Sequence, residues 1–238
     1  MNRQGNLYTI IYSGVLVLVV GIVLSLVYQE LRPAQLENIA NDKKVQILTA
    51  IHEAPEKGAP VGEVFSKFIT DSYIVNYRGE KIDSSKSPFD VDVAAEVKKP
   101  ENERQLPVYV ATTDKGTKYI LPCYGAGLWG PIWGYVAFDN DGNTIYGAYF
   151  SHQGETPGLG AEIEKPDFQN QFENKKVYVD GVFESIAVCK AGQKPAQGDY
   201  VNAISGGTIT SQGVQKMLKN SLQPYNAFLI KLQENKQQ

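Results

Sequence analysis

The fold is decided by residues 107–150, which read PVYVATTDKGTKYILPCYGAGLWGPIWGYVAFDNDGNTIYGAYF. This stretch contains four strand-like runs with recurring apolar side chains, at 107–113, 117–123, 132–139 and 143–150. Short turns separate the members of each pair, Asp114-Lys115-Gly116 in the first and Asn140-Asp141-Gly142 in the second. Turns of this composition between alternating apolar runs are a strong hairpin signal. We therefore predict antiparallel hairpins in the middle of the chain.

Helical patterns flank the hairpins on both sides. On the N-terminal side, apolar residues recur at helical spacing up to about His52, and Pro33 suits the first turn of a helix. We expect this helix to continue from the apolar segment before it as a stalk. Further helix-like segments lie at 61–69, 166–175, 211–222 and 224–234. Helices at both ends with antiparallel strands between them indicate an α+β fold. The sequence has no G-x-G-x-x-G after a strand, which disfavours a doubly wound dinucleotide-binding domain.

The segment from Tyr8 to Tyr28, YTIIYSGVLVLVVGIVLSLVY, contains no charged residue. At about 1.5 Å per residue, a helix of this length spans about 30 Å, the thickness of the hydrocarbon core of a bilayer. A cleaved signal peptide is the alternative, but its apolar region is usually only about 7–15 residues long and ends in small residues. This run is longer and ends in LVYQE. We therefore predict one uncleaved transmembrane helix.

This anchor defines the expected organisation of the chain. The expected parts are a short tail at 1–7, the transmembrane helix at 8–28, a helical stalk or linker at 29–60 and the main domain at 61–238. Arg3 and the free amino group favour an N-terminus inside the cell, whereas Arg32, Lys43 and Lys44 beyond the span weaken that argument.

The composition excludes several functional classes. The 238 residues carry 23 Lys and Arg against 26 Asp and Glu, a net charge of −3, and 42% are hydrophobic. Such a chain is neither intrinsically disordered nor a basic nucleic-acid binder. The two histidines lie far apart and two cysteines cannot form a four-thiolate site, so we predict no metal centre. Cys123 and Cys189 can form a disulfide only if their Cα atoms lie within about 7 Å, and we expect them to be unpaired.

A segment of small residues, AISGGTITSQGV at 203–214, leads into a predicted helix. The N–H groups and the positive dipole end at a helix start suit a phosphate, and Gly206 and Gly207 permit close approach. The segment contains more hydroxyl groups than one helix cap requires, on Ser205, Thr208, Thr210 and Ser211. An ordinary Ser or Thr cap is the alternative explanation.

Two further segments suit a flat or anionic ligand. The loop HQGETPGLG at 152–160 must bend at Pro157-Gly158 and again at Gly160, where backbone N–H groups can approach a ligand. The segment YGAGLWGPIWG at 124–134 combines two tryptophans with four glycines, which suits stacking on a heterocycle. The respective alternatives are a connecting turn and tryptophans packed in the core.

Three motifs behind one N-terminal anchor carry a resemblance to a known family. GLWGPIWGY, HQGETPGLGAEI and VNAISGGTITSQGV, in this order, resemble the C subunit of the Na⁺-translocating NADH:quinone reductases. They are also similar to the related G subunit of the Rnf ferredoxin:NAD oxidoreductase complex. The resemblance covers the anchor and residues 120–218. It implies an FMN-binding domain at 61–238, in which a separate flavin transferase, using FAD and Mg²⁺, joins FMN to Thr208 through a phosphoester bond.

The resemblance also implies the other site residues, and it makes Thr208 a tether with no catalytic residue in turnover. Beside Thr208, the implied FMN-binding residues are Ser205, Gly206, Gly207, Thr210, Ser211, Glu155, Thr156, Gly158, Leu159, Gly160, Leu128, Trp129 and Gly130. Two positions depart from the family pattern: Asn202 stands where an acid is usual, and Gly207 stands where alanine is usual. If the transferase or its Mg²⁺ needs the carboxylate, attachment depends on position 202.

By the same resemblance, the chain is an electron-transfer subunit of a complex that oxidises NADH, reduces a quinone and exports Na⁺. It would bind neither NADH nor quinone, so it is not a complete enzyme alone. Its expected place is the bacterial inner membrane, with the flavin domain on the periplasmic side and other membrane subunits as partners. Two alternatives stay open, an Rnf-type flavin subunit and a non-redox, membrane-anchored binding or assembly module.

Overall fold

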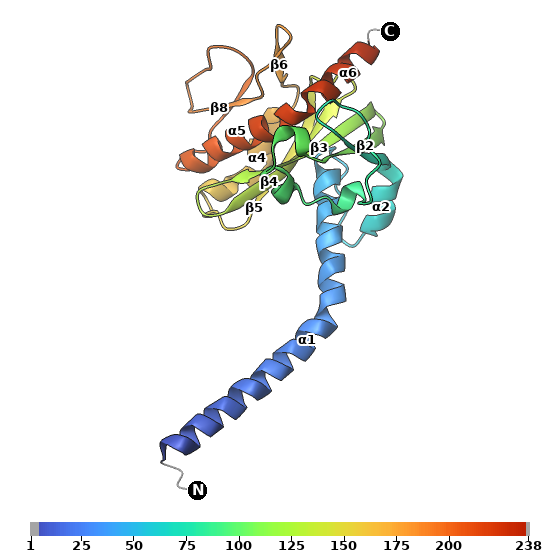
Figure 1. The fold of residues 1–238 in the computed structure, drawn as a ribbon. Coiled ribbons are helices and arrows are strands. Elements are labelled where there is room, and N and C mark those ends of the chain that lie inside the picture. Colours follow the sequence, from blue (N-terminus) through green and yellow to red (C-terminus); the bar gives the residue numbers. More distant parts are fainter. Residues whose placement is uncertain (1–4, 237–238) are drawn as a thin grey trace. The chain divides into compact units, whose positions relative to one another are not determined.

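The computed structural model describes residues 5–236. The chain forms two units, Met1–Lys43 and Lys44–Gln238. Helix α1 (Asn6–Thr49) begins in the first unit, and its last turns belong to the second (Figure 1). Within residues 5–236, α1 is the single helix long and apolar enough to cross a membrane. Its side chains from Ile10 to Tyr28 are exposed, as expected of a surface that faces lipid.

Helix α1 runs without a break from the anchor to Thr49, so the expected continuation of the helix toward His52 is confirmed, although Pro33 lies inside the helix and not in its first turn. A proline inside a helix removes one backbone hydrogen bond. Good helix formers on both sides, Leu31 before it and Ala34 after it, favour continuation of the helix. The expected boundaries at residues 28 and 60 stay a prediction. Arg3, on which the orientation partly rests, lies outside the described residues.

A five-stranded antiparallel sheet forms the centre of the second unit (Figure 1). Its strands follow chain order and are β1 (Ile69–Val75), β2 (Leu106–Thr113), β3 (Gly116–Ala126), β4 (Pro131–Asp139) and β5 (Ile145–His152). Thr113 pairs with Gly116 across the first predicted turn. Asp141 stabilises the second turn, because its Oδ1 accepts the backbone N–H groups of Asn143 and Thr144. The predicted hairpins and the α+β fold are confirmed.

The sheet is apolar on both faces. Leu121 and Val136 belong to the larger core, whereas their neighbours Ile120 and Tyr135 belong to the second core. The helices that cover the two faces are α5 (Thr208–Leu222) and α6 (Asn226–Lys236) over the larger core, and the end of α1 with α2 (Val61–Phe68) over the second. A sheet covered on both faces needs successive apolar positions, which explains the nearly continuous apolar runs of β3 and β4.

The remaining elements are short. They are η1 (Pro88–Asp90), α3 (Val93–Glu96), η2 (Glu101–Glu103), η3 (Gly160–Glu164), α4 (Pro166–Gln169), η4 (Asn170–Phe172), β6 (Tyr178–Val179), β7 (Val182–Phe183), β8 (Ala187–Cys189), β9 (Tyr200–Asn202) and η5 (Gln223–Tyr225). Strands β6 and β7 pair antiparallel, whereas β8 and β9 pair in parallel and bring Asn202 beside Cys189. Both cysteines are free thiols, as expected, and Cys123 is buried.

Candidate functional site

Helix α5 begins at Thr208, and the turn before it is built from small residues. Gly206 has a φ of 74°, a left-handed conformation that favours glycine. Gly207 stands at the N-cap and offers no side-chain hydrogen bond. Ser211 fixes the turn from inside the helix, because its hydroxyl accepts the backbone N–H of Ile204 at 3.0 Å. The N-cap therefore leaves the first N–H groups of α5 available to an anion.

A cavity of about 380 Å³ lies at this helix start. Its wall combines all three segments that the sequence singles out, and its lining residues are Leu128, Trp129, Glu155, Thr156, Leu159, Gly160, Gly206, Gly207, Thr208, Ile209 and Thr210. Ile209 is missing from the sequence-derived set, because an isoleucine between two threonines carries no chemical signal of its own. Four residues of that set lie in the same segments but outside the cavity wall: Gly130, Gly158, Ser205 and Ser211.

Glu155 places a buried carboxylate in the cavity wall, where the residue is only 4% exposed. Thr210 Oγ1 donates to Glu155 Oε2 at 2.6 Å, and the backbone N–H of Trp129 donates to Oε1 at 2.8 Å. Burial alone would raise the pKa of this carboxyl, but these bonds, with a further one from the backbone N–H of Leu128, outweigh burial and lower the pKa below its ordinary value. The carboxylate is therefore ionised at neutral pH.

The loop that carries Glu155 is held by its neighbours. His152 Nδ1 accepts the backbone N–H of Glu155 at 3.1 Å. On the other side of the ring, His152 Nε2 lies 3.8 Å from Glu164 Oε2, and Ser151 donates its hydroxyl to Glu164 Oε1 at 2.5 Å. An Nδ1 atom that accepts a hydrogen bond carries no proton, so His152 positions the backbone here.

Large apolar side chains surround the cavity and are exposed to solvent. Their exposed fractions are 48% for Leu128, 69% for Trp129, 42% for Leu159 and 55% for Ile209. A cluster of this kind is typical of a surface that binds a ligand or a partner. The core explanation therefore does not hold for Trp129. Trp133 does have a structural partner, because its indole N–H donates to Gln46 Oε1 at 3.1 Å.

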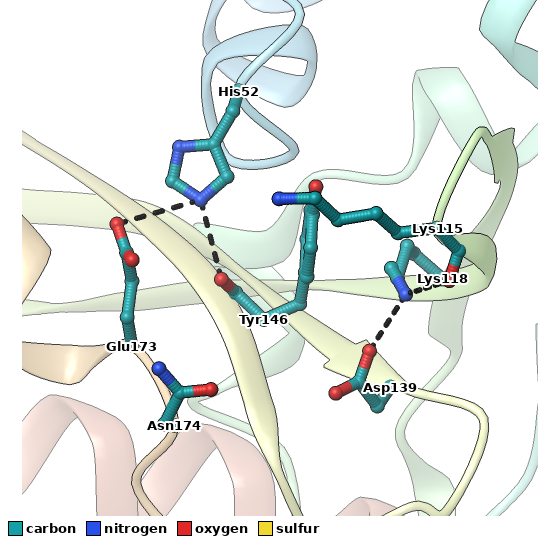
Figure 2. Close-up of a pocket in the computed structure, with 7 residues that line it drawn as sticks. All are labelled: His52, Lys115, Lys118, Asp139, Tyr146, Glu173 and Asn174. Atoms are coloured by element: carbon teal, nitrogen blue, oxygen red, sulfur yellow. Dashed lines mark hydrogen bonds and ion pairs between the residues drawn. The ribbon is translucent and has the colours of Figure 1, made fainter.

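A second cavity, of about 420 Å³, is lined by no residue of these three segments, and Figure 2 shows its lining side chains. Its lining residues are His52, Lys115, Lys118, Asp139, Tyr146, Glu173 and Asn174. Lys118 Nζ lies 2.7 Å from Asp139 Oδ1, and His52 Nε2 lies 3.5 Å from Glu173 Oε1. The charges of Lys118 and Asp139 already neutralise each other, and none of the three segments singled out by the sequence lines this cavity, so it is the weaker candidate for a ligand site.

Known proteins share both the site segments and the fold. Residues 127–223 match the FMN-binding domain family. The C subunit of the Na(+)-translocating NADH-quinone reductase from Vibrio vulnificus is 34% identical over 215 residues, which cover 83% of this chain and 83% of that protein. This chain belongs to the family of the C subunits of Na⁺-translocating NADH-quinone reductases. The resemblance read from the three motifs is thus confirmed.

Two solved structures of this family have the same fold. The C subunit of the reductase from Parabacteroides distasonis is 49% identical, with a TM-score of 0.78, over 84% of this chain and 96% of that chain. NqrC from Shewanella oneidensis is 26% identical, with a TM-score of 0.68, over 82% of this chain and 98% of that chain.

The cavity at the start of α5 fits the FMN group for which the domain family is named. The helix start offers N–H groups for a phosphate beside the Thr208 hydroxyl. A Cβ atom on Gly206 would lie 2.6 Å from Leu159 Cδ2, so glycine keeps this approach open. The exposed Trp129 and Leu128 suit the flat face of an aromatic ring system.

Proposed function

We propose that the chain carries FMN on Thr208 through a phosphoester bond and serves as an electron-transfer subunit of a Na⁺-translocating NADH-quinone reductase. One observation carries the proposal. The Thr208 hydroxyl stands at the start of α5, behind a glycine N-cap, in the wall of a cavity that all three family motifs line. A phosphate at a helix start and a flat ring beside an apolar cluster match this arrangement.

Each part of the cavity has a role in holding the group. Thr208 is the covalent tether, and the first N–H groups of α5 bind phosphate oxygens. Gly206 and Gly207 keep side chains away from that approach. Leu128, Trp129, Leu159 and Ile209 cover the ring and exclude water from it. The bound FMN supplies the redox chemistry, and the protein sets its position and its potential.

The remaining parts of the reductase lie in other subunits. The apolar stretch of α1 contains no ionisable side chain between Thr9 and Val27 except the phenol of Tyr12 near its end, so it offers no path for Na⁺. We propose that residues 8–28 anchor the chain in the bacterial inner membrane, that 29–60 form a stalk and that the domain at 61–238 faces the periplasm. Partner subunits then bind NADH and quinone and conduct the ion, and a flavin transferase attaches FMN.

Peptide mapping of the full chain, produced together with a flavin transferase, tests the tether. We expect Thr208→Ala to abolish the covalent flavin without changing the melting temperature by more than a few degrees, because Thr208 is only partly buried. Ser205→Ala is the matched control, since Ser205 is an exposed hydroxyl in the same turn, and it should keep the flavin. A flavin adduct that persists in Thr208→Ala would exclude Thr208 as the tether. A chain that stays colourless beside an active transferase would instead favour the non-redox alternative.

The same experiment tests whether Asn202 limits the attachment of FMN. It lies on β9 with an exposed side chain, and its backbone N–H donates to Gln171 Oε1 at 2.8 Å. A carboxylate at this position is therefore tolerated sterically, and Asn202→Asp should fold as the parent chain does. A higher yield of flavin in Asn202→Asp would assign the acid of the family pattern to the attachment reaction.

A further inference from the structure

We infer that the Glu155 carboxylate is a fixed negative charge that holds the FMN site in shape and lowers the reduction potential of the FMN bound there. This inference rests on the proposed function. Neither role requires a bond from Glu155 to the flavin, because both carboxylate oxygens already accept hydrogen bonds within the protein. Glu155 is thus a positioning residue, and its effect on the flavin is electrostatic.

Four residues from three segments of the chain surround this carboxylate. Thr210 reaches it from the first turn of α5, and the backbone N–H of Trp129 reaches it from the β3–β4 connection. A Cβ atom on Gly127 or Gly160 would collide with its oxygen atoms. Both positions therefore stay glycine so that the carboxylate can sit between them. The helix that carries the tether is in this way fixed to the two loops that flank it.

Hydrogen-bond dipoles, and not an ion pair, provide most of the stabilisation of the Glu155 charge. Among the ion pairs within residues 5–236, none involves Glu155. The O–H of Thr210 and the N–H groups of Trp129 and Leu128 lower its pKa most, and the electrostatic interaction with His152 contributes least. A buried charge is screened much less than an exposed one. Adding an electron to a group in this cavity therefore works against the carboxylate, which favours the oxidised flavin.

Replacement of Glu155 by glutamine tests the electrostatic role with little change of shape. The amide oxygen of the introduced glutamine can accept the N–H of Trp129, and its NH₂ group can donate to Thr210 Oγ1. We expect Glu155→Gln, in the full chain carrying FMN, to shift the redox equilibrium about tenfold toward the reduced flavin. That shift equals about 59 mV for a one-electron step. Spectroelectrochemical titration at pH 8 measures it, and the melting temperature reports the fold.

A second variant must move the potential in the opposite direction. Thr210→Val keeps the volume and the carboxylate but removes the hydroxyl dipole that offsets its charge, so we expect a shift toward the oxidised flavin. If the Glu155–Thr210 pair had a purely structural role, the reduction potential of the flavin would shift in the same direction in both variants. Asp167→Asn is the control, because Asp167 is an exposed carboxylate on α4, outside the cavity wall and outside the contacts that hold the Glu155 loop. In this control variant, the equilibrium between oxidised and reduced flavin should shift by less than threefold.

The outcomes separate this inference from the proposal on which it rests. The inference is overturned if Glu155→Gln carries flavin at Thr208 but its redox equilibrium shifts by less than threefold, or shifts toward the oxidised flavin. The proposed tether is unaffected by either result. Flavin absent from Thr208 in the unmodified chain overturns the proposed function itself. If Glu155→Gln does not fold or does not take up flavin, the test rests on Thr210→Val. A reduction potential of Thr210→Val that equals or exceeds that of the unmodified chain overturns the inference.

Discussion

Gly160 shows how strongly single residues are constrained in the wall of the candidate FMN cavity. A Cβ atom at this position would collide with Glu155 Oε2 and Thr210 Oγ1, which are bonded to each other. Either the new methyl group breaks that bond or the loop moves. We expect Gly160→Ala to lower the free energy of unfolding by about 1–3 kcal/mol. Urea unfolding of the full chain in detergent measures the change.

Gly154 in the same loop provides the control for Gly160. Nothing lies within 4 Å of a Cβ atom built on Gly154, and its φ is not in the left-handed region. Gly154→Ala should therefore change the free energy of unfolding by no more than about 0.5 kcal/mol. Equal losses in the two variants would mean that the loop resists any added side chain, and the packing around Glu155 would not be the cause.

At this scale the sequence predicts which residues meet but not how they bond. The resemblance to the family implies that Glu155 and Thr210 belong to one site, whereas each segment taken alone only suits a ligand. Their hydrogen bond joins positions 55 residues apart, and no local pattern encodes it. Ile209 was missed for a related reason, since only the fold turns its exposed apolar side chain into part of a cavity.

At the scale of elements, α5 packs very closely against β3. The Cβ atom of an alanine at position 213 would collide with the carbonyl oxygen of Ala126, and one at position 125 would lie 2.7 Å from Met217 Cβ. An exposed Gly→Ala change inside a helix normally stabilises it by about 1 kcal/mol. Here the collision with backbone dominates, so we expect Gly213→Ala to destabilise the chain by about 1–3 kcal/mol.

The sign of the Gly213 effect is the informative quantity. Urea unfolding of Gly213→Ala gives it, and circular dichroism shows whether α5 remains helical. A stabilised variant would contradict the close packing of α5 on β3, since helix propensity alone would then decide. Because Thr208 is the first residue of α5, a helix displaced from the sheet should also attach less flavin.

Some helices and strands can be predicted from local sequence patterns, and others cannot. The hairpins β2–β3 and β4–β5 follow from the turn residues Asp114-Lys115-Gly116 and Asn140-Asp141-Gly142, so the sequence suffices for them. The parallel pairing of β8 with β9 joins short strands across a long loop, and two or three residues give no periodic pattern. The helical spacing that continues from the anchor toward His52 does predict the long α1, whereas the local preference of Pro33 for a first helical turn does not place it inside the helix.

At the scale of the whole molecule, the chain combines an apolar helix with a domain that holds the candidate flavin site. The segment from Tyr8 to Tyr28 is dominated by Leu, Ile and Val residues. At about −0.3 to −0.6 kcal/mol each, they favour membrane insertion by about 4–8 kcal/mol. One arginine at the centre of the helix costs only about 2.5–3.5 kcal/mol, so a single charge should not release the chain.

Two central charges should nearly cancel the gain from insertion. We expect Leu16→Arg combined with Val20→Arg, at a cost of about 5–7 kcal/mol, to move much of the chain out of the membrane fraction, whereas Leu18→Arg alone stays there. Alkaline extraction of membranes followed by immunodetection measures this distribution. The pair Ala34→Arg and Leu36→Arg, outside the apolar segment, should leave the chain in the membrane. Retention of the Leu16, Val20 double variant at the level of the unmodified chain would show that partner subunits, and not α1, hold the flavin domain at the membrane.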